Sequence, residues 1–273
     1  FEVGDLVVGV VRRPDPVPCG ACAHGEFDMC RNGRYTERGI KEVNGYGSEQ
    51  WCVATNYATK VKAGLERVGV LMEPTSVVAK AWEQVYRVGE RSWFEPRRVL
   101  VTGAGPIGLL AALLGVQRGL DVHVLDRVTD GPKPRAVEAL GATYHHQSVD
   151  DVAARLRPDV IIEATGASEV VIAAMSTTAR YGIVCLTGVS PAGRTVHIDA
   201  GALNRDIVLE NDAVVGSVNA NSRHFQRAAQ ALAQADIGWL DALITTRVPL
   251  DRAAEAFEPR EADVKVVIDI GAV

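Results

Sequence analysis

Three of the five cysteines of the chain lie within the stretch CGACAHGEFDMC. Two residues separate Cys19 from Cys22, and seven separate Cys22 from Cys30. Thiolates at such short spacings are typical ligands of tetrahedral zinc, and a CxxC pair can also serve redox chemistry. No strand and helix of a thioredoxin-like unit are predicted around Cys19. We therefore interpret the stretch as a metal-binding lobe, and not as a disulfide knot, a redox pair or a catalytic thiol centre.

A glycine pattern of the type GxGxxG, made by Gly103, Gly105 and Gly108, points to phosphate chemistry. An apolar run typical of a buried strand precedes it, and an apolar run typical of a helix follows it. The first glycine permits a tight turn, the second lets the backbone approach a pyrophosphate, and the third lets helix and strand pack closely. Pro106 and Ile107 open the helix, whose N-terminal amides attract negative charge. The pattern predicts dinucleotide binding.

Asp126 ends the next expected strand. A carboxylate at this position accepts hydrogen bonds from the ribose of adenosine and repels a 2′-phosphate. We therefore predict a preference for NAD. Arg127, beside it, offsets part of that repulsion and leaves NADP as a possible cofactor. A solvated acid beyond a tight turn is the alternative interpretation.

Short loops of small residues follow three later expected strands. Ligands of an open parallel sheet bind beyond the carboxyl ends of its strands, and small side chains let a nicotinamide and its ribose approach the backbone. Ordinary strand-to-helix turns would look the same in sequence. The residues expected to complete the cofactor site are Thr165, Gly166, Thr187, Gly188, Val189, Ser217, Val218 and Asn219.

The elements that must position these groups change character along the chain. Residues 1–72 contain short apolar runs broken by glycine and proline, with alternation at 49–54 and 58–61, which predicts a small β-rich region. Later, apolar runs alternate with helical periodicity, which predicts a parallel sheet covered on both faces. The expected strands span 98–102, 121–126, 160–163, 182–186, 213–217 and 264–270, and the expected helices span 72–88, 107–118, 134–140, 169–177, 222–235 and 252–257.

The composition sets outer limits on function. The chain has 273 residues, 47% of them apolar, which is enough to bury a substantial core. A net charge of −5 gives no reason to expect a nucleic-acid partner. The longest apolar run, 106–116, is too short to span a membrane, and residues 1–5 do not resemble a signal peptide, so we expect a cytoplasmic location. The chain begins without Met inside a strand-like run, and we expect a further N-terminal segment before it.

With the β-rich region, the cysteine lobe, a linking helix and a nucleotide-binding half in this order, the chain resembles the medium-chain dehydrogenase/reductase family, and within it the glucose 1-dehydrogenases. The resemblance rests on the phrases at 11–13, 45–49, 73–74 and 219–225. It implies an α/β fold in which a Rossmann doubly wound parallel sheet joins a partial GroES-like catalytic domain. The implied divisions are 1–72 for the catalytic domain, 73–235 for the linker helix and Rossmann domain, and 236–273 for a segment returning to the catalytic domain.

The resemblance also implies an activity in carbohydrate metabolism, the NAD(P)-dependent oxidation of D-glucose, or a related aldose, at C1 to the lactone with a catalytic zinc. Most ligands of that zinc are expected upstream of residue 1. Glu73 resembles the later acidic ligand or zinc-water partner, and with Glu49 and Asn219 it is expected to contact the sugar. Glu73 could also be a structural acid at a helix start, and Glu49 a solvated residue. Asn221 or Ser222 is the better candidate to cap the next helix, which frees Asn219 for a ligand.

In the family, the lobe carries four cysteines separated by two, two and seven residues, and Pro16 occupies the position of the first. Asp15, His24 or Asp28 could supply the fourth zinc ligand, because zinc accepts oxygen and nitrogen donors. A lobe that has lost its metal is the alternative.

Two other functions stay open at this point. A polyol or secondary-alcohol dehydrogenase would share nearly all of these features, and a truncated, inactive NAD-binding chain would lack only the upstream zinc ligands. Since the family pairs Rossmann sheets edge to edge, the resemblance implies a homodimer or homotetramer. A sugar is the expected small-molecule partner, with no nucleic acid and no membrane.

Overall fold

The computed structural model describes residues 1–258, 260 and 262–271, which form two compact units. The first unit contains Phe1–Ala79 together with the chain from Val218 onward, and the second contains Lys80–Ser217. These limits differ from the expected divisions after 72 and 235, because residues 218–235 group with the N-terminal residues. The helix α2 (Met72–Gly89) runs from the first unit into the second.

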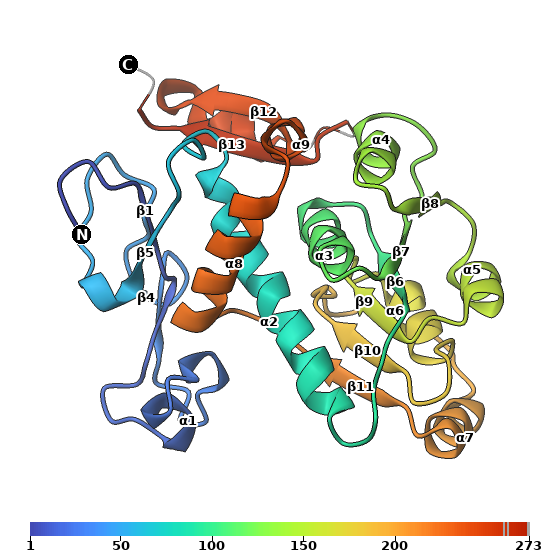
Figure 1. The fold of residues 1–273 in the computed structure, drawn as a ribbon. Coiled ribbons are helices and arrows are strands. Elements are labelled where there is room, and N and C mark those ends of the chain that lie inside the picture. Colours follow the sequence, from blue (N-terminus) through green and yellow to red (C-terminus); the bar gives the residue numbers. More distant parts are fainter. Residues whose placement is uncertain (259, 261, 272–273) are drawn as a thin grey trace. The chain divides into compact units, whose positions relative to one another are not determined.

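The second unit is built on a six-stranded sheet in which every neighbouring pair of strands is parallel (Figure 1). The first strand in sequence lies inside the sheet, and the chain winds outward from it in both directions, so the fold-class prediction of a doubly wound sheet is confirmed. In spatial order the strands are β11 (Ala213–Gly216), β10 (Ile183–Leu186), β9 (Val160–Glu163), β6 (Arg98–Thr102), β7 (Asp121–Leu125) and β8 (Thr143–His145).

Helices cover both faces of this sheet, which explains why the central strands are largely apolar. One face packs against α3, and alternate residues such as Leu100, Ile161 and Val184 form a core with α5 and α6 on the other face. The C-terminal half of α2 also belongs to this unit, where the Trp82 indole donates to the carbonyl of Ala111 at 3.1 Å. The remaining helices of the unit are α3 (Pro106–Val116), α4 (Pro132–Ala139), α5 (Val149–Leu156), α6 (Ser168–Met175) and α7 (Ala200–Glu210).

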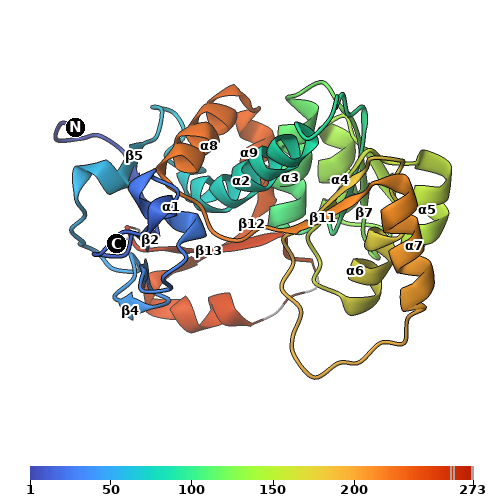
Figure 2. The ribbon, with the colours of Figure 1, turned by 90° about the horizontal axis from the view of Figure 1, so that it is seen from below.

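The first unit contains short strands in three small sheets. Helix α8 packs against β5, as Figure 2 shows. The expected alternation at 49–54 forms no strand, and the chain there is irregular. The strand pairs are β1 (Val7–Gly9) with β5 (Ala58–Lys60), β2 (Arg12–Arg13) with β3 (Thr36–Arg38) and β4 (Glu42–Val43), and β12 (Ile244–Pro249) with β13 (Lys265–Asp269). The helices are α1 (Gly20–Ala23), α8 (Ser222–Gln234), α9 (Ile237–Leu243) and the 3-10 turns η1 (Phe27–Met29), η2 (Thr55–Tyr57), η3 (Gly69–Leu71) and η4 (Leu250–Phe257).

Among the described residues, none of the helices has the length and apolar character that crossing a membrane requires.

Candidate functional site

The glycine loop between β6 and α3 lies at the carboxyl end of the parallel sheet, where such sheets bind ligands. A Cβ on Gly108 would stand 1.7 Å from the carbonyl oxygen of Gly103, so only glycine lets the helix approach the strand this closely. A Cβ on Gly105 would meet no atom within 4 Å. Pro106 and Ile107 form the first turn of α3, as expected. The loop therefore leaves open space in front of its backbone, which fits a pyrophosphate.

The Asp126 carboxylate follows β7 and is tied directly to the glycine loop. One oxygen accepts the Ala104 N–H at 2.7 Å and lies 3.4 Å from the ammonium of Lys133, and the other oxygen accepts the Val128 N–H at 3.2 Å. Arg127 is exposed beside it. Asp126 thus lies next to the loop, as the ribose interpretation requires. Lys133 is a second cation near it that sequence reasoning did not single out.

The loops after β9 and β10 come together at the same end of the sheet. A Cβ on Gly188 would stand 2.2 Å from the backbone nitrogen of Gly166, and a Cβ on Gly166 would stand 2.7 Å from the carbonyl oxygen of Val189. Thr165 and Thr187 both bond to Glu163, the last residue of β9. The structure therefore brings the expected loop residues into contact. Glu163, which joins them, was missed by sequence reasoning.

Ser217, the residue after β11, has a buried hydroxyl without a hydrogen-bond partner in the part of the chain that the structure describes. Its backbone N–H donates to the carbonyl of Leu186 at 2.9 Å, which fixes it beside β10. A buried polar atom of this kind needs a partner, and a bound ligand can supply one. Val218, the next residue, is 60% exposed, and Val189 is 81% exposed.

In the first unit, Asn219 lies against Glu37. The Asn219 backbone has a φ of 64°, in the left-handed region, and its side-chain amide donates to the Glu37 carboxylate. Glu37 is only 7% exposed and forms an ion pair of 3.0 Å with the guanidinium of Arg12. Arg12 also donates to the carbonyl of Asp28 at 2.8 Å. Sequence reasoning did not find Glu37, because an acid in the short strand TER gives no sign of its burial.

Glu49 and Glu73 lie apart from this group. Glu49 is exposed in the irregular segment that precedes η2, and no bond joins it to Asn219. Glu73 is the second residue of α2, where the helix dipole favours an acid. Although its side chain keeps an exposed surface, the protein around it removes enough water to raise the pKa of the carboxyl, while Lys265 acts in the opposite direction. The expected roles of both residues stay predictions.

The three cysteines of the lobe converge. The Sγ atoms of Cys19, Cys22 and Cys30 all lie within 4.8 Å of one another. Hydrogen bonds to the Cys19 sulfur, first from the Arg31 N–H at 3.4 Å and then from Cys22, lower the pKa of the Cys19 thiol to about 6. Burial raises the pKa of Cys22. A preformed group of three soft donors, one of them favoured as a thiolate, fits a zinc ion.

The candidates for a fourth ligand are occupied elsewhere. Asp15 accepts the Val17 N–H at 2.8 Å, and Asp28 accepts the side-chain amide of Asn221 at 2.7 Å. His24 is exposed, with its Nδ1 2.7 Å from the carbonyl oxygen of Gly20. Within the described ranges, none of these groups joins the three thiols in one cluster.

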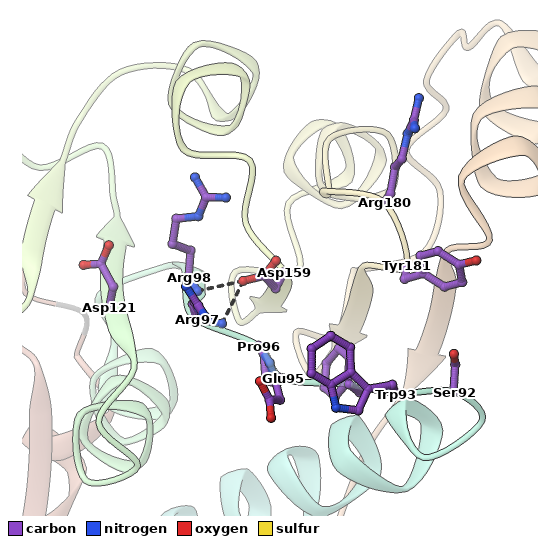
Figure 3. A pocket seen from close by; sticks show the side chains of 11 residues that line it. Ser92, Trp93, Glu95, Pro96, Arg97, Arg98, Asp121, Asp159, Arg180 and Tyr181 are labelled. Carbon is purple, nitrogen blue, oxygen red and sulfur yellow. Dashed lines mark hydrogen bonds between the residues drawn. The ribbon is translucent and has the colours of Figure 1, made fainter.

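A cavity of about 830 Å³ lies at the opposite end of the sheet, around the amino ends of its strands (Figure 3). Trp93 and Arg98 line it, with Arg97, Arg180, Glu95, Asp121 and Asp159. Its arginines and its acids are equal in number, so its charge selects no particular ligand. Because ligands of doubly wound sheets bind at the carboxyl ends, we do not assign the nucleotide to this cavity.

Comparison with known proteins decides the family. The family model described as glucose dehydrogenase C-terminus matches residues 66–270. The chain belongs to the glucose dehydrogenase family. The resemblance inferred from the sequence is confirmed. The chain is 41% identical to the glucose 1-dehydrogenase of Methanocella arvoryzae over 280 residues, which covers 100% of the chain and 78% of the relative. It is 39% identical to that of Thermoproteus tenax, covering 98% and 76%.

Solved dehydrogenase structures have the same fold. The glucose dehydrogenase of Haloferax mediterranei, in complex with NADP, Zn and gluconolactone, is 33% identical and aligns with a TM-score of 0.91 over 100% of this chain and 79% of that chain. The galactitol-1-phosphate dehydrogenase of Escherichia coli, at 24% identity and a TM-score of 0.75 over 93% and 73%, shares the fold.

Substitutions in the glycine loop should separate ligand binding from folding. Gly105→Ala places a methyl group in open space, so we expect unchanged thermal unfolding and weaker binding of NADH and NADPH. Gly108→Ala forces a methyl group onto a carbonyl oxygen, so we expect a loss of about 1–3 kcal/mol of stability or more. Calorimetry and fluorescence titration measure the two effects. Full dinucleotide affinity in Gly105→Ala would contradict the pyrophosphate assignment.

The cysteine lobe should bind zinc through its three thiols. In metal-free protein we expect alkylation of Cys19 to reach half of its limiting rate at a pH of about 6, because its thiolate forms there. Added Zn²⁺ should protect Cys19, Cys22 and Cys30, whereas the exposed Cys52 serves as the unprotected control. Mass spectrometry of the alkylated peptides gives the rates. Lobe thiols that react equally fast with and without zinc would show that the lobe binds no metal.

Proposed function

We propose that this protein is an NAD(P)-dependent glucose 1-dehydrogenase, which oxidises D-glucose at C1 to the lactone by hydride transfer. The observation that carries the proposal is the similarity of the whole chain to enzymes of that name, together with a glycine loop whose open side suits a dinucleotide. The neighbour from Haloferax mediterranei, with NADP, Zn and gluconolactone bound, supports the same reaction.

In this proposal the second unit binds the cofactor. The glycine loop receives the pyrophosphate, and the Asp126 carboxylate accepts hydrogen bonds from the adenosine ribose. Thr165, Gly166, Thr187, Gly188 and Val189 form the loops for the nicotinamide half, and the buried Ser217 hydroxyl offers it a hydrogen bond. We expect turnover with both cofactors and a preference for NAD, since Asp126 repels a 2′-phosphate while Lys133 and Arg127 reduce that repulsion.

The first unit is proposed to recognise the sugar. The Asn219 amide and the Glu37 carboxylate stand side by side, so they offer a donor and an acceptor to neighbouring hydroxyl groups. Arg12 pairs with the Glu37 carboxylate and holds it in place. Glu49 is a further expected sugar contact, although its exposed position gives the role no support.

Glu73 is the residue of the described chain proposed to hold the catalytic zinc, because zinc accepts carboxylate oxygen. The ion would polarise the C1 hydroxyl and lower its pKa. Desolvation by the surrounding protein raises the pKa of Glu73, and a bound cation would favour its ionised form. The same residue is expected to lie close to the sugar.

Substrate choice tests the proposed function. Initial rates with D-glucose, sorbitol and a secondary alcohol, each with NAD and NADP, should be highest with D-glucose. Faster oxidation of sorbitol or of the alcohol would assign the protein to another substrate. Binding of NADH without turnover of any substrate would show an inactive nucleotide-binding chain.

Within the same assay, Asn219→Gly removes the amide and keeps the left-handed backbone free of strain. We expect the KM for glucose to rise by about tenfold, as for the loss of one hydrogen bond. Glu49→Gln is the comparison, and an equal effect there would restore Glu49 as a sugar contact.

We further propose a homodimer or homotetramer in the cytoplasm. β11 is an edge strand of the parallel sheet, and edge strands offer unpaired backbone groups to another chain. Val208 and Leu209, 61% and 69% exposed, lie in the last turn of α7, the helix that precedes this strand. A second copy would cover both the edge and these side chains. The free thiols of the lobe favour a reducing compartment.

Light scattering after gel filtration tests the assembly. We expect Leu209→Arg to convert the oligomer to monomer, because a charge would be buried at the contact. Ile40→Arg, at a side chain 74% exposed in the first unit, is the control and should leave the mass unchanged. A monomeric unmodified protein would refute the proposal.

A further inference from the structure

Glu163, the last residue of β9, is fully buried at the carboxyl end of the sheet. One oxygen of its carboxylate accepts the Thr165 N–H at 2.7 Å and the Gly166 N–H at 3.1 Å, and it also accepts the Thr165 hydroxyl. The Thr102 hydroxyl, at the end of β6, donates to the same oxygen at 3.3 Å. The carboxylate therefore ties the loop after β9 to the strand that leads into the glycine loop.

The backbone of the same residue holds the loop after β10. The Glu163 carbonyl accepts the Thr187 N–H at 2.8 Å, the Gly188 N–H at 3.0 Å and the Thr187 hydroxyl at 2.7 Å. A Cβ on Gly188 would stand 2.7 Å from the other carboxylate oxygen, so the loop rests directly on the carboxylate. One residue thus fixes the two loops that the proposed function assigns to the nicotinamide half of the cofactor.

All groups that bond to this carboxylate are donors. An ionised carboxylate accepts hydrogen bonds only, so Glu163 satisfies two amides and two hydroxyls at once. None of the Lys, Arg or His side chains that the structure describes forms an ion pair with it. A side-chain amide in place of the carboxyl group would turn an NH₂ donor toward these donors.

We propose that Glu163 is a positioning residue for the cofactor. Its carboxylate holds Thr165 and Gly166, against which Gly188 packs, in the geometry that receives the nicotinamide and its ribose. It touches the loops and not the reacting atoms. The proposal rests on the proposed function in so far as a nicotinamide dinucleotide binds at this end of the sheet.

The opposite end of β9 provides a matched control. There Asp159 accepts the backbone N–H groups of Arg97 and Arg98 at 2.8 and 2.9 Å, as the dashed lines in Figure 3 show. Both acids therefore accept backbone amides at an end of the same strand. Only Glu163 lies at the carboxyl end. Asp159→Asn should destabilise the protein by weakening its bonds to backbone amides, and it should leave the binding of nicotinamide dinucleotides unchanged.

The experiment compares NADH and NADPH with ADP, which lacks the nicotinamide half. In Glu163→Gln we expect the Kd for the reduced dinucleotides to rise by about tenfold or more, as for a lost charge-assisted hydrogen bond, and the fluorescence of the bound nicotinamide to fall. The Kd for ADP should stay within about twofold of its value in the unmodified protein. A change that small does not correspond to a lost hydrogen bond. Retained ADP binding also shows that the variant is folded.

Asp159→Asn should leave the dinucleotide-to-ADP ratio of affinities unchanged, even where its melting temperature falls. If Glu163→Gln weakened the binding of NADH and of ADP equally, Glu163 would be a structural residue only. The same conclusion would follow if Asp159→Asn changed the ratio of the two affinities as Glu163→Gln does. Unchanged NADH binding in Glu163→Gln would refute the proposal outright. An unmodified protein that binds neither NADH nor ADP would overturn the proposed function, and the positioning role with it.

Discussion

The contact on which the nucleotide site depends is the close approach of α3 to the end of β6. Gly108 has no Cβ, and its absence lets the helix approach the Gly103 carbonyl. This approach aims the first amides of α3 across the open face of Gly105, where the helix dipole favours an anion. It also places Ala104 so that its N–H reaches Asp126. The open side of the loop and the position of Asp126 are therefore consequences of one packing distance.

Two buried acids, Glu37 and Glu163, hold other candidate site residues, and their bonding partners differ. Glu37 is paired with a buried guanidinium, and removal of one partner from such a pair costs about 3–5 kcal/mol. Glu163 is bonded to amides and hydroxyls of the loops that it organises. The second arrangement can be relaxed by small loop movements, whereas the first needs the whole strand pair β2 and β3. Glu163 thus joins local loops, whereas Glu37 joins two strands.

The helices, strands and candidate site residues that the sequence predicted are those with a clear local pattern. The runs RVLVT and VIIE are mainly apolar and β-branched, so β6 and β9 were placed correctly. β8 was missed because three residues, TYH, form no pattern. α5 and α7 were missed although each has a capping side chain. The Ser148 hydroxyl accepts a backbone N–H of α5 at 3.1 Å, and the Asp199 carboxylate accepts one of α7 at 3.0 Å. The glycine loop and its carboxylate were predicted because their spacing is local. Glu37 and Glu163 could not be, since burial of an acid depends on residues far away in the chain.

The segment 219–225, one of those that carried the family resemblance, forms the start of α8 and the turn before it. Asn221 caps α8 as expected, with its side chain accepting the N–H groups of Arg223 and His224 while its own N–H donates to His224 at 3.1 Å. Its amide also donates to Asp28, which anchors the helix start to the N-terminal residues. Asn219 lies two residues before this anchored cap. Its backbone has a left-handed conformation, which asparagine tolerates better than most residues. Its amide donates to Glu37 two residues before that cap, so the contact with Glu37 and the start of the helix are one structural feature.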